Sequence, residues 1–428
     1  MIPLLLALAP HAHAFCGAYV GAEGEELNNY SSEVVMARTG NVTTLTLISD
    51  YSGDATEFAM LLPIPEVIGP EDVDVVDPVL LEWIADYSMP REVAYSCDTA
   101  FSTTQMGWGC GGSLAPVAGS GLGTALGCSN SSLSYGGQSG AEVEAAWSEA
   151  GYDFVVLSAE ESSGLLDWLD FNGYAVPLGG EAILQEYVDG GAYFLAARVS
   201  LNDAPREGDW LWPIQISYES DVFSLPIRIG TISSTGIQDV VIYALTDAEL
   251  DGTVAISNYP RLEMPEECLL PEDKSMGDWY EERLSQAHAE GGAGWVQEYS
   301  WKLAPVVSGG YHCDPCTAEP VAPSGSFEPF GFDSQSAHLT RLRMRYTTEE
   351  ATQDLQLYIT GITDGEEQLK FISPNTELES LFPYCDTGWA EDPGTCPDAP
   401  MVSCGTPSSR GSAGVLLASF ALLRRRRR

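Results

Sequence analysis

Basic side chains and histidines are scarce in this 428-residue sequence. It holds 62 acidic against 19 basic residues, and only five histidines. Six of the arginines lie in the last 25 residues, so residues 15–403 carry 13 basic and 62 acidic side chains, a formal charge of −49. Such a field repels nucleic acid and anionic lipid headgroups, and it suits solubility or the binding of cations and basic partners. No nucleic-acid partner is expected.

The sequence also lacks the usual signatures of nucleophilic catalysis. No G-x-S-x-G elbow is present, and only His288, His312 and His338 lie beyond residue 14. Adjacent acids such as Glu160-Glu161 carry no weight in a chain this acidic. The pattern favours a protein that is not an enzyme. An extracytoplasmic hydrolytic or thiol–disulfide enzyme is the alternative.

No hydrophobic run is long enough for a conventional membrane anchor. Gly411–Leu423 is uncharged, but as a helix it would span roughly 20 Å, short of the ~30 Å hydrocarbon core. A basic cluster that resists translocation follows, and it is predicted to act as a membrane stop. Its members are Arg424, Arg425, Arg426, Arg427 and Arg428. Small residues, a short apolar run and a basic stop are typical of a tail that is cleaved and replaced by a lasting anchor.

The N-terminus predicts export. Ile2–Ala9 is apolar, and Ala12-His13-Ala14 is a small-x-small cleavage site. We therefore expect residues 1–14 to be a signal peptide cut after Ala14, residues 15–403 to form the exported domain, and residues 404–428 to be a sorting segment. The expected partners are the export machinery, a membrane sorting protease and the membrane itself, with the protein held at the cell surface.

Ten cysteines fit an oxidising compartment. Local spacing favours disulfides Cys110–Cys128 and Cys385–Cys396, and the other pairings stay open. The stretch "HCDPC" contains Cys313 and Cys316, for which we expect structural disulfides. Redox activity would need a helix after the first cysteine, and the Pro- and Gly-rich sequence there provides none. Zinc would need a fourth ligand. No cofactor is expected.

β structure dominates the predicted elements. Three strands between Ser32 and Pro65, separated by Thr39-Gly40-Asn41 and Ser52-Gly53-Asp54, predict an antiparallel meander. A mixed α/β unit follows after the Gly/Ser-rich residues 101–140, which form a surface loop or a boundary between two subdomains. Helices are expected at 78–85, 142–150, 161–173, 181–191 and 276–290, and strands at 91–97, 152–159, 192–201, 211–230, 237–247, 340–346 and 354–360. The predicted class is α+β, β-rich and stapled by disulfides.

Two further patterns have a structural and a functional interpretation. Asp247–Asn258 resembles a calcium loop, but its twelfth position is Asn258 instead of glutamate, and β-type sequences flank it. A hairpin turn explains the same residues, with a calcium-dependent adhesive module as the alternative. Several tryptophans could line a carbohydrate groove, although core packing is the favoured interpretation. They are Trp108, Trp147, Trp168, Trp212 and Trp295.

Five stretches together resemble the bacterial domain of unknown function 2330 family over nearly the whole of residues 15–359. They are "FCGAYVG", "DYSGDATEFAMLLPIP", "YDFVVLSAEESSGLLDWLDFNGYAVP", "YHCDPC" and "LTRLRMRYTTEEATQDLQLYI". The resemblance implies no assigned chemistry. The tail resembles a myxobacterial-type C-terminal sorting tag with Cys404 as its signature cysteine, which implies proteolytic processing and surface retention. We therefore expect an exported cell-surface protein that acts as a structural or binding module.

Overall fold

The computed structural model describes residues 17–94, 140–303 and 327–373, apart from short gaps. The gaps are residues 23–26, 29–31, 50–51, 54–56, 201–205, 208–209, 235, 265–269, 272, 333–335 and 365–366. The chain divides into two compact units. The first comprises Met1–Glu92, Ala125–Val307 and Glu319–Phe371. The described part of the second unit is limited to the last residues of β8 (Arg91–Ala94) and β22 (Lys370–Ser373), so the fold below is that of the first.

A five-stranded antiparallel sheet forms one half of the first unit. Its strand order is β1 (Ala18–Val20), β6 (Glu57–Ile64), β11 (Tyr193–Ser200), β10 (Tyr152–Ala159) and β9 (Ala141–Glu149). Side chains alternate between its two faces, so Phe154 and Val156 enter one apolar cluster while Val155 and Leu157 enter another. Both faces of this sheet are therefore covered.

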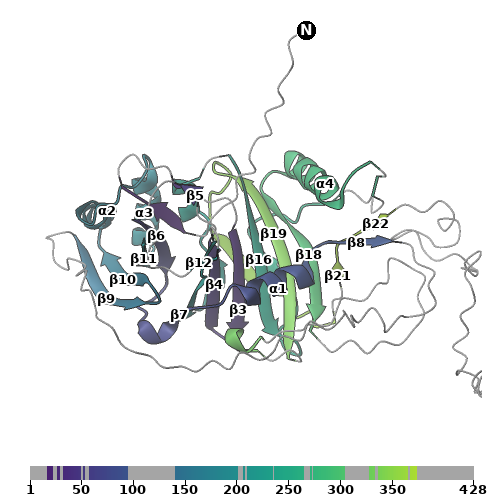
Figure 1. The fold of residues 1–428 in the computed structure, drawn as a ribbon, viewed down its shortest axis with the longest axis horizontal. Helices are drawn as coiled ribbons and strands as arrows, with labels where there is room; N and C mark the ends of the chain where they lie inside the picture. The colour runs from purple at the N-terminus through teal and green to yellow at the C-terminus, as the bar shows by residue number, and fades with distance from the viewer. Residues whose placement is uncertain are drawn as a thin grey trace, which may run out of the picture. The chain divides into compact units, whose positions relative to one another are not determined.

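Helices α2 (Ser162–Phe171) and α3 (Gly180–Asp189) cover the outer face of this sheet (Figure 1). Leu165 and Leu169 of α2 and Leu184 of α3 are fully buried against the strands. These apolar positions recur every three or four residues, as expected for amphipathic helices. The predictions of both helices and of the strands that flank them are confirmed.

The prediction of a helix at Glu142–Ala150 is wrong, because these residues form the edge strand β9. The register of β9 against β10 shifts between Val156 and Leu157, opposite Ala145 and Val143. This bulge moves Ala145 and Trp147 to the opposite face from Val143, although half-buried and exposed residues still alternate along the strand. Alanine and glutamate, both strong helix formers, supplied the false signal.

An eight-stranded mixed sheet packs against the inner face of the first sheet. Its order is β21 (Glu367–Gln368), β18 (Gly294–Lys302), β19 (Ala337–Thr347), β16 (Ile237–Asp247), β3 (Ser32–Thr39), β4 (Val42–Ser49), β14 (Ile214–Glu219) and β7 (Val73–Val75). All pairs are antiparallel except β16 with β3. The main apolar core lies between the sheets and contains Met36, Phe154 and Ile242.

The predicted three-stranded meander is only partly correct. β3 and β4 form the expected hairpin around Gly40, whose φ is +61°. β6, however, belongs to the five-stranded sheet. Ser52–Gly53 is not a turn but the short strand β5, which pairs with β2 (Leu27–Asn28). β6 carries apolar side chains on both faces, for example Phe58 and Ala59, so it is stable only in the sheet that is covered on both sides.

The outer face of the eight-stranded sheet carries α1 (Val79–Ser88) and α4 (Met276–Gly291). In Figure 1, α1 crosses β3 and β16, and its Leu81 and Ile84 pack on Val35 and Tyr243. Both helices are confirmed predictions. The remaining strands are β15 (Ser224–Leu225), β20 (Leu355–Ile359) and β17 (Val254–Ile256), which form a three-stranded sheet, and the pair β12 (Arg206–Glu207) and β13 (Trp210–Leu211). Single 3₁₀ turns occupy Pro70–Asp72, Ile229–Ile232 and Glu328–Phe330.

The β-rich α+β class is thus confirmed. All ten cysteines lie outside the described residues, so the predicted disulfide staples stay predictions. Residues 101–139 of the predicted Gly/Ser-rich loop also lie outside them. Within the described ranges, no helix is long and apolar enough to cross a membrane.

Candidate functional site

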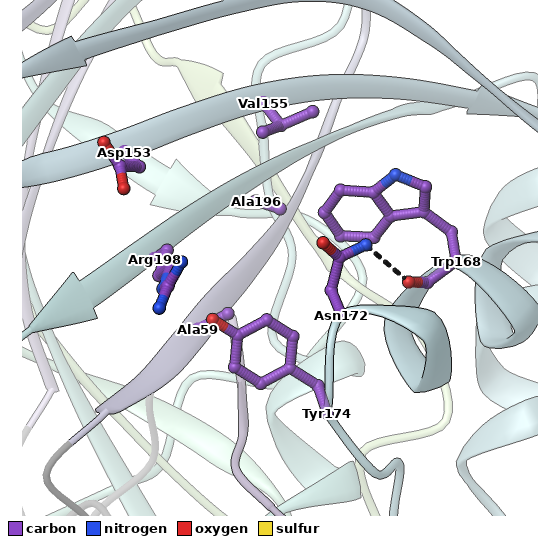
Figure 2. Close-up of a pocket in the computed structure, with 8 residues that line it drawn as sticks. All are labelled: Ala59, Asp153, Val155, Trp168, Asn172, Tyr174, Ala196 and Arg198. Atoms are coloured by element: carbon purple, nitrogen blue, oxygen red, sulfur yellow. Dashed lines mark hydrogen bonds between the residues drawn. The ribbon is translucent and has the colours of Figure 1, made fainter. Parts of the chain in front are cut away.

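A small pocket lies between α2 and the outer face of the five-stranded sheet (Figure 2). Its floor consists of Ala59 from β6, Val155 from β10 and Ala196 from β11, all nearly fully buried. The two alanines occupy positions where larger side chains would fill the space under the helices. The pocket exists because these two strands carry methyl groups at this point.

The walls of the pocket come from α2 and the turn that ends it. Trp168 lies on the last turns of the helix, and Asn172 and Tyr174 follow on either side of Gly173, whose φ of +86° favours glycine. Asn172 Nδ2 donates to Trp168 O at 2.8 Å, so the amide is held in place (Figure 2). The backbone N–H of Tyr174 donates to Leu169 O at 2.9 Å, which fixes the turn. Both aromatic side chains are less than a tenth exposed.

Two opposite charges border the pocket. In the strand register, Asp153 on β10 lies directly opposite Arg198 on β11, and Arg198 lies opposite Ala59 on β6. Both charged side chains are half-buried. Ser148 on β9, the other neighbour of Asp153, donates its hydroxyl hydrogen to Asp153 Oδ1. The Asp153 carboxylate therefore already accepts a hydrogen bond from one hydroxyl group of the protein.

The pocket can hold one small group. Its volume is about 20 Å³, enough for roughly one water-sized group. It joins aromatic and methyl surfaces to acceptors (Asp153 and Asn172 Oδ1) and to the guanidinium donors of Arg198. Among its lining residues only Asp153 is acidic. This composition fits binding, and it does not supply the two carboxylates that glycoside hydrolysis uses.

A second polar cluster is fully buried. His338 Nε2 lies 2.9 Å from Ser300 Oγ, which in turn lies 2.8 Å from Thr253 Oγ1. Burial, with a smaller contribution from the charge of Lys302, lowers the pKa of His338 to about 4, so its imidazole is neutral at pH 7. His338 and Ser300 are at most 1% exposed. A serine–histidine pair without access to substrate is structural, and no sequence pattern had predicted it.

A layer of buried charges lies under α4. Arg341, Arg343 and Arg345 alternate along β19 on the outer face of the sheet. Arg343 and Arg345 contact α4, whereas Arg341 contacts Glu298 of β18 and donates to Ala85 O of α1 at 3.0 Å. Arg345 binds Asp239 on β16 with two hydrogen bonds of 2.7 and 2.5 Å. Burial opposes ionisation of Asp239, but the hydrogen bonds and charges of Arg345 and Arg343 outweigh it and lower its pKa to about 2.

The same layer holds α4 to the sheet. Glu281 of α4 forms ion pairs with Arg343 at 3.2 Å and with Arg345 at 2.5 Å. Tyr280 donates its hydroxyl hydrogen to Glu298 of β18, which also pairs with Arg341. Three arginines thus meet three carboxylates, and the charges are balanced. We interpret the layer as structural.

The stretch Asp247–Asn258, for which a hairpin turn was predicted and calcium binding was the alternative, begins with a turn in the structure. Asp247 Oδ1 accepts the backbone N–H groups of Glu249 and Leu250 at 2.8 and 2.9 Å, which is a turn-forming role. Gly252 has φ +69°, and a Cβ there would overlap the carbonyl oxygen of Ile362. The turn links β16 to β17, which belong to different sheets, so it is not a hairpin. No group of three or more metal ligands occurs in the described part of the chain.

The other predicted site residues divide into three groups. The processing residues Ala14 and Cys404, the arginines Arg424–Arg428 and the cysteines Cys110, Cys128, Cys313, Cys316, Cys385 and Cys396 lie outside the described residues, as does Trp108. Trp295 is in the main core, and Trp147 packs on it and stacks on Phe154. The half-buried Trp212 accepts a hydrogen bond from Tyr152 through its carbonyl oxygen. Trp168 alone of the described four lines the pocket.

The fold and the pocket therefore describe a β-rich α+β protein. Over residues 10–358 the chain matches the family model described as an uncharacterized protein conserved in bacteria (DUF2330). The chain belongs to this family, which confirms the resemblance found in the sequence. No curated protein and no solved structure matches it.

Proposed function

We propose that the protein is an exported, cell-surface binding module whose ligand contacts the pocket formed by α2 and β6, β10 and β11. This pocket is the main support for a binding role. It is lined by aromatic side chains and by one acidic, one basic and one amide side chain. Catalysis is disfavoured because the serine–histidine pair of the described residues, Ser300 and His338, is buried.

Export and surface retention are supported by the two ends of the sequence. An apolar run and Ala12-His13-Ala14 stand at the N-terminus, and Cys404, a short apolar run and five arginines stand at the C-terminus. The charge of −49 over residues 15–403 would keep such a domain soluble outside the cell. The proposed mature protein begins at Phe15 and ends near Cys404.

The intact mass of the protein from native cells tests the processing. A chain that begins at Phe15 and ends near Cys404, with or without added lipid mass, is the expected result. An uncut C-terminus would overturn the processed-tail proposal. Deleting Ser412–Arg428 should release the protein into the medium, whereas unchanged association with cells would contradict surface retention.

Alkylation of the native protein tests the thiol–disulfide alternative. If Cys313 and Cys316 are bonded to each other or to other cysteines, neither should react before reduction. Rapid labelling of either residue would instead favour the enzyme. The calcium-dependent alternative requires that calcium raise the melting temperature and that Asp251→Ala abolish that shift. We expect no shift, because the Asp247 carboxylate already binds backbone N–H groups.

A further inference from the structure

The polar groups of the pocket complement a hydroxyl group. Asp153 and Asn172 Oδ1 can only accept hydrogen bonds, and the guanidinium of Arg198 can only donate them. A guanidinium carries five N–H donors, so Arg198 can keep a partner within the protein and still donate to a ligand. A hydroxyl group donates one hydrogen bond and accepts others, so one hydroxyl can satisfy both kinds of neighbour.

The charges that border the pocket offset each other. Asp153 and Arg198 are paired directly across β10 and β11. A carboxylate or phosphate that approached Arg198 would also face Asp153, and an ammonium group that approached Asp153 would also face Arg198. The attraction by one neighbour is therefore largely cancelled by the repulsion from the other, and a ligand with a full charge gains little to offset its loss of hydration. The ligand that fits is neutral and polar.

The remaining surfaces favour a group attached to a carbon skeleton. The floor is made of the side chains of Ala59, Val155 and Ala196, and Trp168 and Tyr174 form aromatic walls (Figure 2). Aromatic rings contact C–H groups well and keep a polar edge for hydrogen bonding. The volume of about 20 Å³ admits roughly one water-sized group, so one hydroxyl group could enter while the rest of the ligand stays outside.

We propose that the pocket binds neutral carbohydrate, taking in one hydroxyl group of a sugar residue in a polysaccharide. The hydroxyl donates to Asp153 or Asn172 Oδ1 and accepts from Arg198, much as the Ser148 hydroxyl already donates to Asp153. This ligand class rests on the proposed binding function. A surface-held protein would meet such polysaccharides outside the cell.

Saturation-transfer NMR with the mature chain tests the ligand class. The probes are the methyl glycosides of glucose, galactose, mannose and N-acetylglucosamine, with glutamate and lysine as charged comparisons. We expect transfer to at least one neutral glycoside, strongest at the protons next to the inserted hydroxyl, and none to the amino acids. The proposal would be overturned if no saturation were transferred to any glycoside, or if an amino acid bound more strongly.

Two variants and a matched control locate the binding. Asp153→Asn keeps the size of the side chain, and Asn172→Ala removes the amide, so each should weaken glycoside binding at least tenfold. The control is Asp170→Asn, which removes one charge from the exposed side of α2, the helix that Asn172 follows. It should leave glycoside binding unchanged. Equal binding by all three variants would place the glycoside elsewhere and refute the assignment. Should Asn172→Ala unfold because its bond to Trp168 is lost, Asp153→Asn alone decides.

The two proposals fail separately. A protein that is cut at both ends and held on the surface, but binds no glycoside, would disprove the ligand class and leave the export proposal intact. A protein that binds glycosides but keeps both termini would do the reverse.

Discussion

The two helical layers of the first unit cover their sheets by different means. α2 and α3 lie on the five-stranded sheet through an apolar cluster in which Leu165, Leu169 and Leu184 are fully buried. α4 lies on the eight-stranded sheet through charges and hydrogen bonds, with Glu281 bound to Arg343 and Arg345. α4 also buries Trp279, Tyr280, Leu284 and Ala287 in two smaller apolar clusters.

The two layers differ in how their stability depends on neighbouring side chains. Apolar burial contributes roughly 25 cal/mol per Å² whatever the exact partner, so the α2–α3 layer should lose stability in proportion to what is removed. A buried charge is stable only while its partners remain, because an unpaired one retains the full cost of desolvation. The α4 layer should therefore lose somewhat more stability on single changes, and it should tolerate matched pairs of changes.

Removing Asp239 should produce the largest effect. Asp239→Ala leaves Arg345 and Arg343 without their buried carboxylate, so we expect a loss of about 4 kcal/mol in the free energy of unfolding. Urea denaturation measures it. Glu282→Ala on α4 is the control, since Glu282 is half exposed and pairs with Lys274 on the surface. Its cost should stay below about 1 kcal/mol. Equal costs for the two variants would show that burial of the charge layer is unimportant.

Truncating the apolar layer should cost somewhat less. Leu165→Ala removes a fully buried side chain from the cluster between α2 and the sheet. We expect a loss of about 3 kcal/mol, from transfer free energy plus the cavity that remains. The loss should not change between pH 7 and pH 5, because no titrating group is involved. A clear pH dependence of this difference would contradict the contrast between the layers.

Acid should weaken the strand that carries the charge layer. His338 on β19 has a pKa of about 4 in the folded protein, against roughly 6.5 when unfolded. The unfolded chain therefore binds the proton first, and stability should fall as the pH drops from 6.5 to 4, by up to roughly 3 kcal/mol. The measurement is the difference in unfolding free energy between wild type and His338→Gln at pH 7 and pH 4. A difference that stays constant over this range would exclude a buried neutral imidazole.

Replacing a charge pair together should have the smallest effect. Asp239→Leu combined with Arg345→Met converts part of the charged layer into an apolar one, and we expect stability within about 1 kcal/mol of wild type. A double-mutant cycle with the single variants measures the coupling, which should exceed about 2 kcal/mol. Additive costs would mean that the two residues act independently despite their two hydrogen bonds.

Most elements of the fold could be predicted from the sequence because their patterns are local. The helices at Ser162–Phe171 and Met276–Gly291 and the strands at Tyr152–Ala159 and Ile237–Asp247 follow directly from periodicity. β9 was predicted as a helix because its alanines and glutamates are strong helix formers, although its half-buried and exposed residues alternate as in a strand. The strand β6 was predicted correctly, but its partner could not be, since pairing between sheets depends on residues far away in the chain.

The candidate site was largely invisible in the sequence. Trp168 was considered for a carbohydrate groove, but its neighbours Asp153 and Arg198 become a pair only through the register of β10 and β11. The arginines of "LTRLRMRYT" alternate with apolar residues, which is also the pattern of a strand with one exposed face. Only the position of α4 shows that they are buried. In both cases the chemistry arises from contacts between distant segments.

The parallel pairing of β3 with β16 also determines how the protein can assemble. It brings Ser32 next to Val240, and β19 must then add to β16 before the strand β18 finds its place. When a chain is made from its N-terminus, the five-stranded sheet has all its strands once Ser200 is reached, whereas the eight-stranded sheet must wait for Gln368. Contacts this distant in sequence make folding slow. Until β14 and β16 are made, β3 and β4 remain a hairpin with an apolar face and unpaired edges, which is the stretch that would most need a chaperone.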